Sequence, residues 1–110
     1  MPMKISEQNI KNYTVVAIDG RLDTNHCDTF EKQMMEIVTR SNHLILDCKN
    51  LEYISSSGLR IFLVLQKKLM ALSGQMKLCQ LQPAIKEIFE ISGFTMIFSI
   101  FSDLEKALES

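Results

Sequence analysis

Glycine-rich loops, metal-ligand clusters and catalytic histidines are all missing from this sequence. Its four glycines make neither of the patterns that cradle nucleotide phosphates. His26 and His43 have no obvious nucleophile, and both are expected to be surface or boundary residues. The three cysteines are too widely spaced for a zinc site, so Cys27, Cys48 and Cys79 are expected to be free, mostly buried thiols. These absences argue against an enzyme and against a metal site.

Strong net charge and long apolar runs are also missing. A net charge of −1 provides no general attraction to nucleic acid or to an acidic membrane. No apolar run approaches the roughly 20 residues of a membrane span, and Met1–Lys4 lead into mixed polar sequence rather than a signal peptide. Apolar residues nevertheless make up 46% of the chain, which is enough for a core. We therefore expect one cytoplasmic domain over residues 1–110, with no membrane and no direct nucleic-acid partner.

Hydrophobic periodicity divides the chain into alternating strands and helices. Strands are predicted at residues 3–8, 13–19, 43–47, 76–81 and 96–101, and helices at residues 23–40, 57–73, 83–92 and 103–109. Gly20 is expected to end the second strand, Gly74 to cap the second helix and Ser102 to cap the last helix. This order predicts an α/β fold: an N-terminal β-hairpin leading into a mixed, mostly parallel sheet with about four helices.

The stretch 44–60 passes from an apolar strand, through three consecutive serines, into an apolar helix. Ser55, Ser56 and Ser57 thus lie at a predicted helix N-terminus, where unpaired N–H groups favour oxygen anions. A serine here has two candidate roles, as the helix cap or as a site of phosphorylation. The chemistry alone favours the cap, because serine is among the commonest N-cap residues. Three serines are more than one cap requires.

The second predicted helix has two apolar faces. Its core stripe is predicted to consist of Phe62, Leu65, Leu69 and Leu72. A different face carries Leu59, Leu63 and Met70. These three side chains either pack on a neighbouring helix or form an exposed contact surface, and the sequence leaves both options open. Asp47 follows a strand where α/β folds place ligands, and we interpret it as a cap of the loop.

Residues 47–59, centred on Tyr-Ile-Ser-Ser-Ser-Gly-Leu-Arg, resemble the signature of the STAS domain. Within that family the resemblance is greatest to the bacterial anti-sigma factor antagonists. Gly20-Arg21-Leu22-Asp23 is similar to a second family element, Gly-x-Leu-Asp at the end of an early strand. The resemblance extends over nearly the whole chain in length and order of elements. It aligns Ser56 with the phosphoacceptor serine of the family and Ser55 with a position that is usually Asp.

The resemblance implies a switchable binding module that needs no cofactor of its own. In such a cycle the unphosphorylated domain binds an anti-sigma factor that is also a serine kinase, and a sigma factor is released. Phosphorylation of Ser56 ends the binding, and a metal-dependent phosphatase of the PP2C type restores it. The partner surface is expected to contain Asp23, Thr24, Asn25, Ser55, Ser57, Gly58, Leu59 and Leu63.

Two other roles of STAS domains remain open. One is a scaffold or transporter-associated subunit that is never phosphorylated. The other is a small-ligand or nucleotide-binding domain that uses the helix N-terminus as an anion site.

Overall fold

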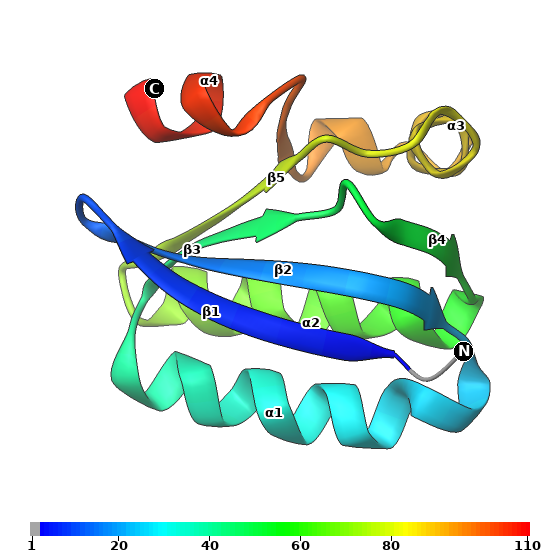
Figure 1. Ribbon diagram of the computed structural model, residues 1–110, viewed down its shortest axis with the longest axis horizontal. Coiled ribbons are helices and arrows are strands. Elements are labelled where there is room, and N and C mark those ends of the chain that lie inside the picture. Colours follow the sequence, from blue (N-terminus) through cyan, green and yellow to red (C-terminus); the bar gives the residue numbers. More distant parts are fainter. Residues whose placement is uncertain (1–2) are drawn as a thin grey trace.

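A six-stranded sheet forms the centre of the computed structural model, which describes residues 3–110 (Figure 1). Its strands are β1 (Lys4–Ile10), β2 (Tyr13–Leu22), β3 (His43–Asp47), β4 (Leu51–Ile54), β5 (Gln75–Cys79) and β6 (Ser99–Phe101). β1 and β2 form an antiparallel hairpin, and the sheet continues through β3, β5 and β6 in parallel, while β4 pairs in parallel with the end of β2. The predicted α/β fold is confirmed. Met1 and Pro2, part of the segment inspected for a signal peptide, lie outside the described residues.

The helices lie on both faces of the sheet. They are α1 (Cys27–Arg40), α2 (Ser56–Ala71), α3 (Pro83–Ile91) and α4 (Leu104–Glu109), with short 3-10 turns η1 (Thr24–His26) and η2 (Phe94–Met96). In Figure 1, α1 and α2 run side by side beneath one face, and α4 lies over the other. Because successive strand residues point to opposite faces, neighbours such as Val15 and Val16 enter different cores.

The main core lies between the sheet and helices α1, α2 and α3. At its centre the rings of Phe30, Phe62 and Phe89 are fully buried. The ring centroids of Phe30 and Phe89 each lie 6.1 Å from that of Phe62. Offset and tilted aromatic pairs of this kind add to the stability that burial itself provides. Phe62 belongs to the predicted core stripe of α2, together with the buried Leu65 and Leu69. That part of the prediction is confirmed.

A second, smaller core lies under α4 on the opposite face of the sheet, around Val15, Ile45, Cys79 and Ala107. Beside it, Lys77 of β5 is only 4% exposed. Its ammonium group donates hydrogen bonds to the Tyr13 hydroxyl at 2.7 Å and to the carbonyl oxygen of Ala107 at 2.8 Å. A buried charge is tolerated when it is hydrogen-bonded in this way. Lys77 therefore connects the sheet to the last turn of α4.

Strand β2 is longer than predicted, because Gly20 bends it instead of ending it. Gly20 has a φ of 106°, a conformation that favours glycine, and the register between β2 and β4 shifts between Gly20 and Arg21. This bulge lets Arg21 and Leu22 continue the strand and pair with β4. Strand β4 was missed because its four residues alternate weakly and follow the preceding strand after a short turn.

The end of α2 also differs from the prediction that Gly74 is its cap. Ser73 takes the left-handed conformation with φ 60°, and the amide of Gly74 donates to the carbonyl of Leu69 at 2.7 Å. A Cβ at position 74 would lie 1.9 Å from the Asn42 carbonyl oxygen, so close backbone approach explains this glycine. Leu72, predicted in the core stripe, follows the last helical residue and is 46% exposed.

The C-terminal segment contains two further corrections. The strand predicted at residues 96–101 is only β6, because the chain first forms the 3-10 turn η2. Asp103, and not Ser102, caps α4: its carboxylate accepts a hydrogen bond from the amide of Lys106 at 2.8 Å. Aspartate is as good a cap as serine, so the two adjacent candidates could not be separated by type alone.

Candidate functional site

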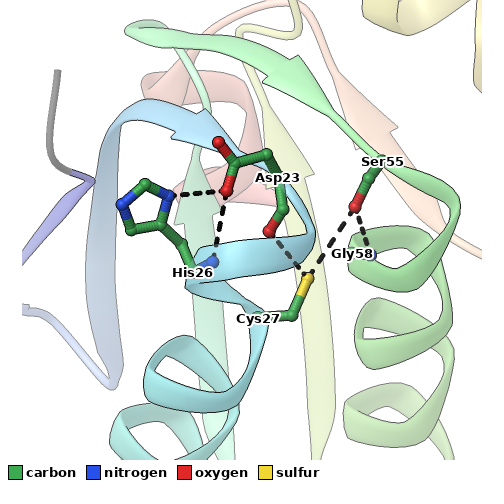
Figure 2. A network of polar contacts seen from close by, with 5 residues as sticks. All are labelled: Asp23, His26, Cys27, Ser55 and Gly58. Atoms are coloured by element: carbon green, nitrogen blue, oxygen red, sulfur yellow. Dashed lines mark hydrogen bonds and ion pairs between the residues drawn. The ribbon is translucent and has the colours of Figure 1, made fainter.

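The ends of two neighbouring parallel strands bring the Asp23 loop and the serine turn together. Leu22 pairs with Ile54, so the segments that follow β2 and β4 leave the sheet at the same edge. The amide of Ser55 donates to the Leu22 carbonyl at 2.9 Å. Farther along, the thiol of Cys27 lies 3.8 Å from the Ser55 hydroxyl (Figure 2). The structure therefore brings together the two loop segments of the expected partner surface.

Ser55 is the N-cap of α2. Its backbone is extended, with φ −82° and ψ 170°, and its hydroxyl oxygen accepts a hydrogen bond from the Gly58 amide at 3.1 Å (Figure 2). The Ser55 carbonyl accepts the first helical hydrogen bond, from Leu59. The side chain is buried, which leaves its hydroxyl committed to the helix. An N-cap of this type contributes about 1 kcal/mol to stability.

Ser56 and Ser57 are not required for the cap. Ser56 is the first residue of α2 and is exposed, whereas Ser57 is half-buried. Within residues 3–110, the Ser56 hydroxyl makes no hydrogen bond. The turn thus separates two roles that the sequence could not assign: a buried serine holds the helix, and an exposed serine presents a free hydroxyl at a helix N-terminus.

Gly58 places the start of α2 directly on the ends of β2 and β4. It is buried, and a Cβ there would lie 2.9 Å from Ile54 and 3.0 Å from Leu22. Contacts this short are almost never made by real Cβ atoms, so a side chain here would force the helix start or the Ile54 and Leu22 side chains to shift. The glycine therefore sets the position from which the exposed serine projects.

Asp23 organises the other loop through a compact set of contacts. Its carboxylate caps η1, accepting from the His26 amide at 3.2 Å and contacting Nδ1 of the His26 ring at 2.7 Å (Figure 2). Burial alone would raise the pKa of this carboxyl group, but the hydrogen bond and charge of His26, helped by nearby amides, outweigh it and lower the pKa. Thr24 and Asn25, also predicted to contact a partner, are exposed on η1.

Two members of this network were missed at the sequence level. His26 lies three residues after Asp23, a spacing typical of a capped turn that could have indicated the pair. Cys27 begins α1, donates to the Asp23 carbonyl at 3.1 Å and meets Ser55 across 28 residues of sequence. No local pattern reveals a contact at that separation, because it depends on the pairing of β2 with β4.

The second apolar face of α2 is partly covered. Leu59 and Leu63 are half-buried and pack against the main core, whereas Met70 is 64% exposed. The alternative of packing within the protein therefore applies to part of the surface of Leu59 and Leu63, and the remainder of both side chains is open to solvent. They lie on the same helix as the exposed serine, one and two turns after it.

Other polar groups near the sheet edge have structural roles. The Asp47 carboxylate accepts hydrogen bonds from the Lys49 amide at 3.1 Å and from the Gln80 side chain at 2.9 Å, so its interpretation as a loop cap is confirmed. All three cysteines are free and buried, as predicted. Burial, reinforced by Asp47, raises the pKa of Cys79 to about 12, which keeps the thiol protonated and unreactive.

Residues 3–110 contain no cluster of three or more histidine, cysteine or acidic side chains that could hold a metal ion. In the same range, no helix combines the length and apolar character needed to cross a bilayer.

Comparison with known proteins identifies the family to which this fold belongs. The sequence profile of the STAS domain matches residues 4–107. Over 106 residues, the chain is 33% identical to BtrV of Bordetella bronchiseptica, a candidate anti-sigma factor antagonist. The match covers 96% of this chain and 91% of BtrV. It is 29% identical to the anti-sigma F factor antagonist of Paenibacillus polymyxa, covering 98% of this chain and 94% of that protein.

Solved structures show the same fold at lower sequence identity. The anti-sigma factor antagonist SpoIIAA in its unphosphorylated form matches with a TM-score of 0.81 at 18% identity, over 96% of this chain and 94% of that one. The phosphorylated form of Bacillus SpoIIAA matches with a TM-score of 0.74 at 18% identity, over 96% and 97% of the two chains. The protein is thus a STAS domain. Within that family it belongs to the anti-sigma factor antagonists.

Proposed function

We propose that this anti-sigma factor antagonist is a partner-switching protein controlled by phosphorylation of Ser56. In its unmodified form it binds an anti-sigma factor that is also a serine kinase, and the sigma factor is freed. The kinase transfers the γ-phosphoryl group of ATP to the Ser56 hydroxyl oxygen, ADP leaves, and the hydroxyl proton is taken up by the kinase or solvent. A phosphatase of the PP2C type then hydrolyses the phosphoserine.

The observation that carries this proposal is the division of roles within the serine turn. Ser55 holds the helix cap with a buried hydroxyl, whereas Ser56 presents an exposed hydroxyl that makes no hydrogen bond within residues 3–110. Modification of Ser56 therefore leaves the cap of α2 intact. The existence of a phosphorylated form of SpoIIAA, which has the same fold, supports this assignment.

The physical effect of phosphorylation is local. A phosphoryl group adds about −1.5 to −2 charges. At a helix N-terminus the domain accommodates that charge with a gain of about 0.3–1 kcal/mol, so no change of fold is required. The partner surface, fitted to a bare hydroxyl, meets bulk and charge instead. A penalty of about 3 kcal/mol is enough to lower affinity more than a hundredfold.

This function assigns the nucleotide and the metal ions to the partners. The domain acts in the cytoplasm as a binding protein, not as an enzyme, and needs no cofactor of its own. The contact surface comprises the exposed Thr24 and Asn25 on η1, the serine turn, and the solvent-facing parts of Leu59 and Leu63. Asp23 and Gly58 contribute by fixing the two segments, because their own polar groups are engaged within the protein.

The test begins with capture of binding proteins from the native cell by the unmodified domain. The captured kinase is incubated with ATP and with wild type, Ser56→Ala, Ser55→Ala or Ser57→Ala, and the phosphorylated position is identified by mass spectrometry. Loss of phosphorylation in Ser56→Ala, with retention in the Ser57→Ala control, supports the proposal. Undiminished phosphorylation of Ser56→Ala refutes the assignment. If no variant is phosphorylated by any captured protein, the scaffold role gains support instead.

A further inference from the structure

Arg60 is a cation without a carboxylate partner on the helix that carries the serine turn. Helix α2 contains no acidic residue along its whole length, and Arg60 is exposed in its second turn. The residues three and four positions away are Ser56, Ser57, Leu63 and Val64, none of which has a negative charge. The ion pairs found within residues 3–110 do not include this guanidinium.

Electrostatic interactions within the helix do not explain an arginine at this place. The N-terminal end of a helix carries partial positive charge, and cations are favoured at the opposite end. With no acidic neighbour on α2, Arg60 also gains no side-chain pair along the helix. The positive charge of Arg60 is therefore available to an anionic group that is added to the protein.

Helix geometry places Arg60 on the same face of α2 as Ser56. Side chains on a helix lean toward its N-terminus, and residues four apart lie one above the other, with Cβ atoms about 5–6 Å apart. Arg60 follows Ser56 by four positions, so an acidic group on Ser56 takes the more favourable order of an i, i+4 pair. A planar guanidinium also matches two phosphate oxygens at once.

We propose that Arg60 is the intramolecular binding residue for the phosphoryl group on Ser56, an inference that rests on the proposed phosphorylation of that serine. In the unmodified protein the guanidinium makes no ion pair within residues 3–110 and lies near the proposed contact surface, in the first half of α2. Once Ser56 is phosphorylated, Arg60 folds back and pairs with two phosphoryl oxygens. Phosphorylation thus does more than add negative charge, because it also withdraws a cation from the surface that a partner meets.

The proposal is tested on the full chain with phosphoserine installed at position 56 during translation, so the measurement needs no kinase. The second ionisation of the phosphoserine is followed by ³¹P NMR at low salt in wild type, Arg60→Gln, Arg60→Lys and Lys67→Gln. Lys67 is a matched control: it is exposed on the same helix, about 16 Å farther along its axis than Ser56. Both Gln variants remove one positive charge from an exposed helical site, so neither is expected to unfold the domain.

Pairing with Arg60 stabilises the doubly charged phosphate and lowers its pKa. We expect Arg60→Gln to raise the phosphoserine pKa by about 0.3 relative to wild type, and Arg60→Lys to give a smaller rise. Lys67→Gln is expected to change it by less than half as much. The difference between wild type and Arg60→Gln should shrink at 1 M salt, where screening acts over about 3 Å.

Equal pKa values in wild type, Arg60→Gln and Lys67→Gln would overturn the pairing. That result leaves the proposed phosphorylation of Ser56 standing, because the kinase assay measures it separately. Conversely, failure of any kinase to modify Ser56 would refute the proposed function without changing the NMR result. The two ideas can therefore fail independently.

Discussion

The substitution Ser55→Ala tests whether Ser55 is the serine that caps α2. In Ser55→Ala, the buried amide of Gly58 loses its acceptor at 3.1 Å, and the Cys27 thiol loses its neighbour at 3.8 Å. Loss of a cap with a buried donor costs about 1–2 kcal/mol. For 110 residues, an unfolding entropy of about 2.1 cal/mol/K per residue gives about 0.23 kcal/mol/K. The expected fall in Tm is therefore about 4–9 °C.

The matched comparison is Ser56→Ala, measured by the same thermal and urea unfolding experiments. The Ser56 side chain is exposed and makes no hydrogen bond within residues 3–110, so its removal should change stability by less than about 0.5 kcal/mol, or about 2 °C. Ser55→Asp should keep most of the wild-type stability, because aspartate also caps helices and favours the N-terminal end. A larger loss in Ser56→Ala than in Ser55→Ala would show that the cap has been assigned to the wrong serine.

Three further predictions concern charge and packing around the same site. Ser56→Asp should weaken binding of the captured anti-sigma factor less than phosphorylation does, because it adds one charge instead of nearly two. Calorimetry at two salt concentrations should show that the electrostatic part of this loss of affinity shrinks as salt rises. Undiminished binding by both charged forms would exclude Ser56 as the switch. Leu63→Lys should lower the free energy of unfolding by about 1–2 kcal/mol, because Leu63 packs on the core. Met70→Lys, at a 64% exposed position, should change it by less than about 0.5 kcal/mol. Equal losses of stability for the two variants in urea unfolding would contradict the packing of Leu63. The pKa of Asp23 is lower in the folded protein than its ordinary value of 3.8, so the stabilising effect of this carboxylate is complete above pH 3.8 and is lost as pH falls through the folded pKa. Wild type should therefore lose stability below about pH 4 more steeply than Asp23→Asn does. Parallel pH profiles of stability would count against the His26 contact.

The parts of the fold that could be predicted have local causes. Strand β3 is a short apolar run, and α3 begins at Pro83, a residue whose fixed φ suits the first helical position. The missed parts depend on distant residues. Gly20 looks like a strand terminator until β4 is present to pair beyond the bulge. Gly74 looks like a helix cap, but the Asn42 carbonyl on another connection explains it.

The candidate site could likewise be predicted only where its features have local causes. The three serines and the glycine after them placed the helix start to within one residue, and the apolar spacing identified the buried stripe of Phe62 and Leu65. Which serine is the cap could not be read from type, because all three are equally good caps. The decision comes from backbone pairing: Ser55 is tied to Leu22 at 2.9 Å, which leaves Ser56 outside.

The small core under α4 has a consequence for how the molecule opens. It contains few buried side chains, among them Ala107 of α4, and the ammonium group of Lys77 donates a hydrogen bond to the carbonyl oxygen of Ala107. The sheet separates this core from the one that supports the serine turn. Regions with few buried contacts exchange their amide hydrogens by local opening, at a lower free energy than global unfolding. The amides of α4 should therefore exchange as a unit of their own, while those of α2 retain the protection of the whole domain.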